Sequence, residues 1–395
     1  MTTATAPRDA ASANTEAAIW VDDDPWDEHD IPPRPWIAPG YALRGSVTLA
    51  IGPPSAMKSS LFIAWSCALA LGRAHGDFRP VRAGSSILYN VEDVADEQRR
   101  RLSAALRQFG AVPADVRGRI IRAGPVGVGT LFVRDRQTGI VASTPAMEEL
   151  RALIAARRPD ILFADPLVEL HVDDENDNGA LRAIIAAFRA IAVEYDIAVV
   201  LAHHIRKGAA TPGDPDAARG AGAIVGACRV AVTLCPMSVE DAEALGLPTD
   251  RPTRSRYLRL DDARQSYAGL GNPRWYEKVL YRLDNGEMVS AMVPWQPPDP
   301  WEAITPAQAN RILDDIEAGL EDGRRYSDAA AAGERAAWVV VRQRAPTLSE
   351  AQARAVIRTW IRNGLLFVKT YRDPTSRKDR LGLYVDATKR PGPRP

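Results

Sequence analysis

Short apolar runs alternate with helical patterns through the middle of the 395-residue chain. Apolar positions recur at helical spacing in DEQRRRLSAALRQFG and GALRAIIAAFRAIAVEYD, which lie between the runs. This alternation is typical of an α/β fold with a mostly parallel central sheet. The runs that we predict to be its strands are SVTLAIG (46–52), SSILYNV (85–91), GRIIRAG (118–124), DILFAD (160–165) and DIAVVLAHH (196–204).

Acidic and proline-rich stretches divide the chain into four predicted parts. Residues 1–30 contain one basic and eight acidic residues, and their first 18 residues are mostly small and polar, so we predict a disordered acidic segment. Residues 31–295 carry the α/β pattern and form the predicted main domain. Proline-rich residues 296–306 are a predicted linker. Residues 307–395 form a smaller, predominantly basic C-terminal domain.

The first apolar run leads into GPPSAMKSS, which matches the phosphate-binding pattern G-x-x-x-x-G-K-[ST] except at one position. Gly52, Lys58 and Ser59 stand where the pattern requires them, and Met57 replaces the second glycine. Backbone N–H groups of residues 53–58 are expected to surround a phosphate at a helix N-terminus. The predicted nucleotide-binding residues are Gly52, Pro53, Pro54, Ser55, Ala56, Met57, Lys58, Ser59 and Ser60.

Met57 leaves two interpretations of this loop open. A residue other than glycine can adopt the required backbone at the first turn of a helix, in which case the cost is only steric and the thioether packs beside the nucleotide. Alternatively, the loop no longer binds ATP. Lys58 and Ser59 are retained, as are acidic residues further along the chain, and this favours a working site.

Four of the predicted strands end in the phosphate loop or in ionisable residues. Ligands of open α/β sheets bind beyond the carboxyl ends of the strands. Asp165 would hold Mg²⁺ together with the Ser59 hydroxyl, and Lys58 would contact the β- and γ-phosphates. Glu92 would deprotonate the attacking water, and His204 would sense the γ-phosphate. The alternatives are a helix N-cap for Glu92 or its neighbour Asp93, and a purely structural histidine.

A loop rich in glycine, proline and alanine, residues 208–218, follows the last predicted strand. Arg219 and Arg229 flank the small-residue segment after it. An arginine held in this way could reach the γ-phosphate of a neighbouring subunit, as arginine fingers do. We favour Arg229 for this role over Arg219. The alternative is that both are ordinary surface arginines.

These motifs, in this order, resemble the RepA-type branch of the RecA/DnaB superfamily of P-loop ATPases. The resemblance covers roughly residues 34–292 and departs from the pattern at Met57. It implies a RecA-like fold, ATP and Mg²⁺ as ligands, a hexameric ring, and functional roles for Lys58, Glu92, Asp165, His204 and Arg229. The segment 257–279 also resembles the closing strands of that fold, with Arg264 near its middle.

The C-terminal segment predicts a winged-helix-like domain. Ser349 and Gln352 form a capping-box pattern, and Asn363-Gly364 closes the predicted helix. Two predicted strands around a basic turn follow. A helix and a wing of this kind can bind DNA, although winged helices also dock proteins. The candidate nucleic-acid residues are Arg354, Arg358 and Arg362 on the helix, and Arg377, Lys378 and Arg380 on the turn.

Composition narrows the function classes. The chain has 50 basic and 50 acidic residues, so any nucleic-acid binding must come from a local patch. Its three cysteines show no metal-like spacing, which fits a reducing compartment. The most apolar run, LFIAWSCALALG, is shorter than the about 20 residues that span a bilayer. We expect a cytoplasmic protein that does not enter the membrane.

Together these features predict an ATP-hydrolysing, ring-forming motor. Its expected partners are other copies of the chain and DNA, as in a helicase or translocase of plasmid, phage or mobile-element replication. The alternative function is a nucleotide-dependent switch or loader that binds DNA or protein without unwinding.

Overall fold

The structure is a computed structural model. It divides into two compact units, Met1–Pro35 and Trp36–Pro395, and each is described by itself. In the first unit, residues 28–30 form the short 3₁₀ helix η1 (Glu28–Asp30). The described residues are 24–54, 56–126, 129–134, 138, 141–171, 178–204, 212–214, 222–297, 304–329 and 332–392.

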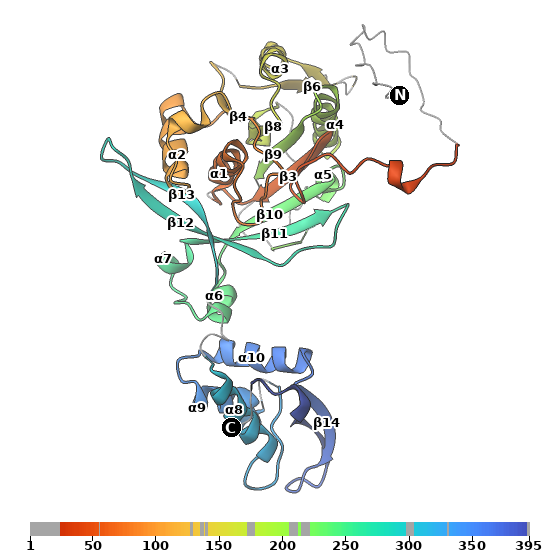
Figure 1. Cartoon of the computed structure of the whole chain (residues 1–395), viewed down its shortest axis with the longest axis vertical. Coiled ribbons are helices and arrows are strands. Elements are labelled where there is room, and N and C mark those ends of the chain that lie inside the picture. The colour runs from red at the N-terminus through yellow and green to blue at the C-terminus, as the bar shows by residue number, and fades with distance from the viewer. Residues whose placement is uncertain are drawn as a thin grey trace, which may run out of the picture. The chain divides into compact units, whose positions relative to one another are not determined.

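A nine-stranded sheet forms the centre of the second unit, in the order β13-β12-β11-β10-β3-β9-β8-β4-β5 (Figure 1). The strands from β10 to β5 run parallel, and β11, β12 and β13 continue as an antiparallel meander. The strands are β3 (Ser46–Gly52), β4 (Ser86–Asn90), β5 (Ile120–Ala123), β8 (Ile161–Asp165), β9 (Ala198–His204), β10 (Val230–Pro236), β11 (Tyr257–Gln265), β12 (Arg274–Arg282) and β13 (Met288–Trp295).

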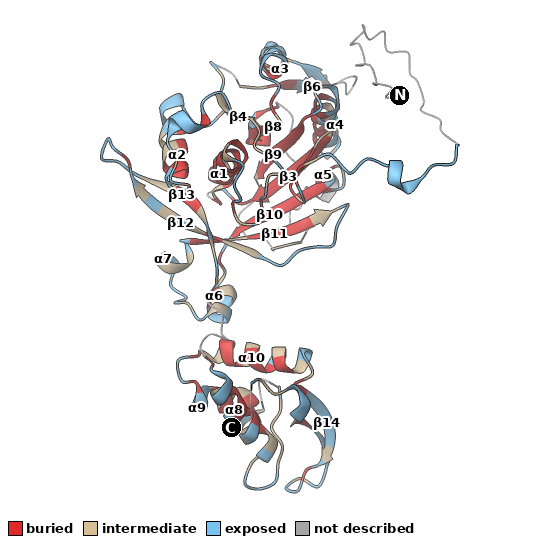
Figure 2. Cartoon of the chain, in the orientation of Figure 1, coloured by how far each residue is buried: buried red, intermediate tan, exposed pale blue. Residues whose placement is uncertain are grey.

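The predicted α/β class with a mostly parallel sheet is therefore confirmed. All five strands that the apolar runs predict lie side by side in the sheet, in the order β3-β9-β8-β4-β5. Parallel strands buried on both faces give short continuous apolar runs, which explains why these five were visible in the sequence. Burial is nearly complete in β3, β9, β8 and β4, whereas the residues of the edge strand β5 are half-buried (Figure 2).

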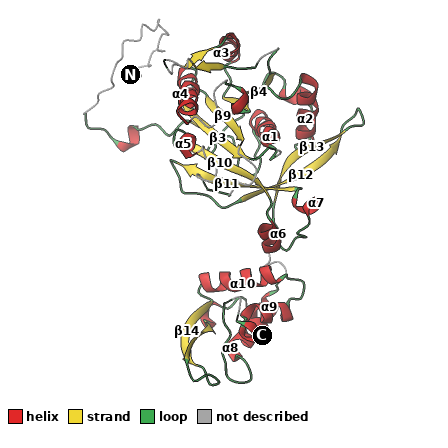
Figure 3. Ribbon diagram, turned by 180° about the vertical axis from the view of Figure 1, so that it is seen from behind, coloured by secondary structure: helices red, strands yellow, loops and turns green. Residues whose placement is uncertain are grey.

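Helices cover both faces of the sheet (Figure 3). One core joins the sheet to α1 (Lys58–Leu71) and α2 (Ala95–Arg107), and a second joins it to α3 (Pro145–Arg157) and α4 (Asn178–Glu194). The smaller elements are α5 (Gly222–Val225), α6 (Val239–Leu245), α7 (Arg251–Arg254), β1 (Trp36–Ala38), β2 (Ala42–Leu43), β6 (Phe132–Arg134) and β7 (Val141–Ser143).

The C-terminal region consists of three helices followed by a β-hairpin. A separate core that includes Val356 and Trp360 joins its elements. The predicted capping box is present, because the Ser349 hydroxyl accepts from the Gln352 N–H and the Ser349 N–H donates to the Gln352 side chain. The elements are α8 (Pro306–Ala318), α9 (Ala337–Arg344), α10 (Glu350–Arg362), β14 (Leu366–Arg372) and β15 (Asp379–Val385).

Domain boundaries between these regions stay predictions. Strand β13 ends at Trp295 and α8 begins at Pro306, on either side of the predicted linker. Within the described part of the chain, no helix is long and apolar enough to cross a membrane.

Candidate functional site

The parallel order of the sheet brings the candidate groups to one edge. Strands β3, β9, β8 and β4 are consecutive neighbours, and Gly52 is level with His204 while Asn90 is level with Asp165. Their carboxyl ends therefore meet, and Lys58, Glu92 and His204 line a single cavity of about 810 Å³. Four sequence segments that are far apart in the chain thus form one site.

Gly52 allows the chain to turn tightly out of β3. A Cβ atom at this position would lie 2.4 Å from the carbonyl oxygen of Leu234, so no other residue fits without movement of the backbone. The loop then passes Pro53, Pro54 and Ala56, and α1 begins at Lys58. Ser55, also predicted to bind nucleotide, lies outside the described residues, whereas Ser59 and Ser60 line the cavity.

Met57 adopts the left-handed backbone conformation, with φ 58° and ψ 32°. This explains why glycine usually stands here, since a side chain in this region costs roughly 1–2 kcal/mol. Met57 therefore does adopt a backbone that favours glycine, but it does so as the N-cap of α1 rather than within its first turn. The side chain is half-buried and packs against the core that contains α1.

Lys58 is buried and uses all three of its N–H donors inside the site. Its Nζ donates to the carbonyl oxygens of Gly52 at 2.8 Å and Pro53 at 3.1 Å, and to Nδ1 of His204 at 2.9 Å. Burial lowers the pKa of Lys58 to about 8, although Asp165 and Glu92 oppose this shift. An incoming phosphate would have to take the place of these neutral acceptors.

His204 links the lysine to the candidate base. Burial, followed by the charge of Lys58, lowers the pKa of His204 to about 4, so the ring is neutral near pH 7. Because Lys58 can only donate, Nδ1 of the ring must accept and the proton lies on Nε2. Nε2 is 3.8 Å from Oε1 of Glu92.

Asp165 is the most buried acid of the site, with 3% of its surface exposed. Burial raises its pKa, while a hydrogen bond from the Ser59 hydroxyl and the charge of Lys58 oppose this. Its Oδ1 has no hydrogen-bond partner among the described residues. A buried carboxylate oxygen next to a hydroxyl fits Mg²⁺, which prefers oxygen ligands.

Glu92 lies at the rim of the cavity, where its side chain is 44% exposed. Burial and then the nearby carboxylate of Asp165 raise its pKa, which favours proton uptake. It does not cap a helix, because the N-cap of α2 is Val94. Asp93 does not cap α2 either; it pairs with Arg101 at 3.0 Å.

Asn90 is a site residue that the sequence patterns did not indicate. Its Oδ1 accepts from the N–H groups of Glu92 at 2.9 Å and Asp93 at 2.7 Å, and its Nδ2 faces Oδ2 of Asp165 at 3.4 Å. Asn90 therefore holds the turn that carries Glu92 next to the carboxylate of Asp165, the candidate Mg²⁺ ligand. An asparagine directly before an acidic pair is an Asx-turn signal that could have identified it.

The sequence patterns also did not indicate the residues that form the far wall of the cavity. This wall comes from α2 and from the β12–β13 hairpin, and an ion pair of 2.6 Å between Arg100 and Glu287 joins the two. Lys278 and Ser290 line the hairpin side. No local pattern connects the hairpin to the phosphate loop, because they are more than 200 residues apart in sequence.

Arg229 lies at the opposite edge of the sheet. It directly precedes β10, whose first residue, Val230, is level with Thr48 in the middle of the parallel strand β3. The four residue steps from Thr48 to Gly52 span roughly 13 Å of strand. Arg229 is therefore not part of the cavity of its own chain, and Arg219 lies outside the described residues.

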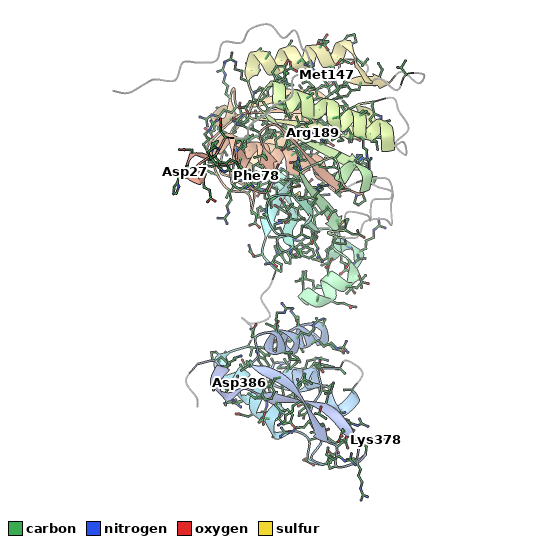
Figure 4. All side chains as sticks on the ribbon, turned by 90° about the vertical axis from the view of Figure 1, so that its right-hand side faces the viewer. Asp27, Phe78, Met147, Arg189, Lys378 and Asp386 are labelled. Atoms are coloured by element: carbon green, nitrogen blue, oxygen red, sulfur yellow. The ribbon has the colours of Figure 1, made fainter. Side chains whose placement is uncertain are left out.

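The C-terminal candidate residues are not equivalent. Arg354 is held within its domain by Glu350 and by the ring of Trp338 at 5.4 Å. Arg358 and Arg362 are exposed on α10. On the hairpin turn, Arg377 and Lys378 are exposed, and Arg380 is partly neutralised by Asp373 at 3.2 Å. Lys378 projects from the end of the domain (Figure 4).

A glycine-ended strand, a buried lysine at the start of the next helix and a strand-terminal aspartate define a P-loop nucleotide site on a parallel sheet. A family model described as an AAA domain matches residues 12–210, half of the chain. The chain belongs to this family of P-loop ATPases, whose members generally use ATP and Mg²⁺.

Replacement of Met57 tests the left-handed backbone. Met57→Gly and Met57→Ala both remove the side-chain packing, but only glycine removes the strain. We expect the glycine variant to be more stable than the alanine variant by about 1 kcal/mol, measured by urea unfolding. Met57→Gly should also bind nucleotide at least as tightly as the wild type.

Arg158 provides the matched control. It also has positive φ, 44°, but it ends α3 on the other face of the sheet. Arg158→Gly and Arg158→Ala should show the same stability difference without any change in nucleotide affinity. Equal stability of the two Met57 variants would contradict the assigned backbone conformation.

Proposed function

We propose that the protein is an ATP-hydrolysing motor that assembles into a ring, with a hexamer as the expected form, and acts on DNA in the cytoplasm. The sequence motifs resemble those of the RepA-type motors of plasmid, phage or mobile-element replication, and the proposed function follows this resemblance. The observation that carries the ATPase part is the convergence of Lys58, Glu92, Asp165 and His204 at the carboxyl edge of four adjacent strands.

Each residue has a distinct part in the proposed hydrolysis. Lys58 exchanges its carbonyl and histidine acceptors for phosphate oxygens, and the released His204 is then free to donate to the γ-phosphate. Asp165 and Ser59 would hold Mg²⁺, which supplies charge neutralisation on the phosphates. Glu92, whose raised pKa favours proton uptake, takes the proton of the attacking water.

Lys58→Ala and Glu92→Gln should separate binding from chemistry. Loss of the ammonium should abolish Mg²⁺-dependent ATP hydrolysis. The amide of Glu92→Gln keeps the shape of the side chain but accepts no proton, so we expect near-normal ATP affinity with turnover about 10²- to 10⁴-fold lower. Nucleotide affinity and turnover are measured on the same preparations.

Glu194→Gln is the control, since Glu194 pairs with Arg151 on the face of α3 and α4. It should turn over ATP like the wild type. Normal turnover by Glu92→Gln would remove Glu92 from the mechanism, and normal turnover by Lys58→Ala would remove the phosphate-loop assignment altogether.

The position of Arg229 supports hydrolysis between subunits. It is exposed at the amino edge of the sheet, and its side chain has no hydrogen-bond or ion-pair partner among the described residues. A head-to-tail contact would bring this edge of one subunit to the nucleotide edge of the next. An arginine supplied in this way adds about 10³- to 10⁵-fold to phosphoryl transfer.

Mixed oligomers test this arrangement. Arg229→Ala and Lys58→Ala should each be inactive alone, while a mixture should recover partial activity at interfaces that combine an intact Lys58 with an intact Arg229. Specific activity of the wild type should rise with protein concentration in parallel with oligomer mass. Turnover by a monomer at a concentration-independent rate would exclude the trans-acting arginine.

The C-terminal domain is proposed to be a winged helix that binds DNA phosphates. The order of three helices and a hairpin supports this, as do the exposed Arg358 and Arg362 and the basic turn. A specific observation favours protein docking as the second candidate: Phe367, Val368 and Leu381 are 43%, 41% and 60% exposed on the hairpin. A docking role would correspond to a switch or loader rather than a motor.

Replacing Arg377, Lys378 and Arg380 together with alanine should reduce the slope of log K against log salt by up to about 2–3 on duplex DNA, because each lost phosphate contact removes about 0.9. Basal ATP hydrolysis without DNA should not change. Arg344→Ala is the control, since this arginine is held by Asp315 at 2.7 Å. A wild-type chain whose DNA binding does not depend on these residues would favour protein docking.

A further inference from the structure

A turn at the amino edge of the sheet is held by two arginines from different elements. Helix α5 ends at Val225, and carbonyl groups at the end of a helix have fewer backbone partners within the helix than those in its interior. Arg264 of β11 donates through Nη1 to the carbonyl oxygens of Val225 at 3.2 Å and Gly226 at 2.9 Å. Arg189 of α4 donates through Nη2 to the carbonyl oxygen of Ala227. Three consecutive carbonyl groups are thus bound by two guanidinium groups.

The buried thiol of Cys228 lies in the same turn. Burial raises the pKa of Cys228 to about 12, and the charges of Arg189 and Arg264 oppose this rise. The Cys228 N–H donates to the Val225 carbonyl at 3.1 Å. Cys228 is 2% exposed and anchors the turn in the core that contains α4.

The next residue, Arg229, is fixed at its backbone but not at its side chain. Its carbonyl oxygen accepts from the Ser266 N–H at 3.0 Å, and β10 then pairs with both β3 and β11. The side chain is exposed and, within the described part of the chain, has no hydrogen-bond or ion-pair partner. A rigid backbone with an unengaged guanidinium is the arrangement needed to present a charge to another molecule.

The surface around Arg229 has the charge of an anion-binding cleft. A depression of about 730 Å³ is lined by Arg44, Arg182, Arg189 and Arg229, and no acidic residue is among the described residues that line it. Arg44 is neutralised by Asp160, whereas the Arg229 side chain has no ion-pair partner among the described residues. Arg189 lies on α4 (Figure 4).

We propose that Arg264 and Arg189 are positioning residues that clamp the Val225–Ala227 carbonyl groups and thereby aim Arg229, from this arginine-lined cleft, at the nucleotide of a second copy of the chain. This inference rests on the proposed trans-acting role of Arg229 and adds the residues that make it effective. Displacement of a catalytic group by about 1 Å can cost about 10²-fold in rate, so loss of the clamp should be measurable.

The test uses Arg264→Gln and Arg189→Gln in the full chain. Both variants should bind Mg²⁺-ATP with wild-type affinity, because the clamp is at the edge away from the phosphate loop, while turnover should fall about 10- to 100-fold. Arg256→Gln is the matched control: this exposed arginine precedes β11, pairs with Glu277 at 2.5 Å and does not reach the turn. It should keep wild-type turnover.

Subunit mixing distinguishes a positioning role from general damage. Arg264→Gln has an intact nucleotide site and a misdirected Arg229, so it should recover activity when mixed with Lys58→Ala and should not when mixed with Arg229→Ala. A variant with a damaged fold would complement neither. If Arg264→Gln unfolds, Arg189→Gln, altered at an exposed side chain, is put through the same mixtures.

The outcomes separate the two proposals. Suppose first that Arg229→Ala and Lys58→Ala complement each other. The clamp is then overturned, and the trans-acting arginine stands, if Arg264→Gln shows any one of three results: normal turnover, no recovery of activity with Lys58→Ala, or recovery of activity with Arg229→Ala. If Arg229→Ala and Lys58→Ala do not complement each other, the trans-acting arginine is wrong and the clamp has no catalytic role.

Discussion

The parallel register of β3, β9, β8 and β4 is the constraint on which the candidate site depends. These strands place their carboxyl ends together, so that each last residue or following turn meets the others at one edge. Side chains alternate between the two faces of a strand. If β9 slipped by one residue, His203 would take the position that His204 now has next to Lys58. The apolar faces packed against α1 and α4 fix this register.

Lys58 shows how the same edge is prepared for an anion. Its ammonium group is buried, and its hydrogen-bond partners are two carbonyl oxygens and a neutral imidazole. Phosphate oxygens in their place would keep these charge-assisted hydrogen bonds and add the attraction between an ammonium and an anion. The lowered pKa of Lys58 and the raised pKa values of Glu92 and Asp165 have burial as their largest cause. A bound anion would raise the pKa of Lys58, and a bound cation would lower the pKa values of Glu92 and Asp165. The two ions together would therefore oppose the shifts that burial causes.

The sequence was sufficient for the features that depend on local pattern. Five strands were visible as apolar runs, and Lys58, Glu92, Asp165 and His204 were identified because each stands where a run ends. The contact of Lys58 with His204 was not predicted, because it depends on the register between β3 and β9, which the sequence patterns do not give. The hairpin wall with Lys278 was missed because it joins the cavity only through tertiary packing. The left-handed backbone of Met57 could have been predicted, because the phosphate-loop pattern has glycine at this position and glycine is the residue that adopts this conformation without strain.

The two edges of one sheet explain why a single chain would be an incomplete catalyst in the proposed mechanism. Lys58, Glu92 and Asp165 belong to the carboxyl edge, whereas Arg229 belongs to the amino edge, separated by the length of β3. A rigid sheet cannot fold back to join them, so Arg229 can reach a nucleotide only when that nucleotide is bound by a second copy of the chain. Such a contact uses different surfaces on the two partners and is head-to-tail, and repeated contacts of this kind form a closed ring when their rotation closes. The clamp on the Arg229 turn then serves the neighbouring site rather than its own, which links the fold of each subunit to the activity of the next.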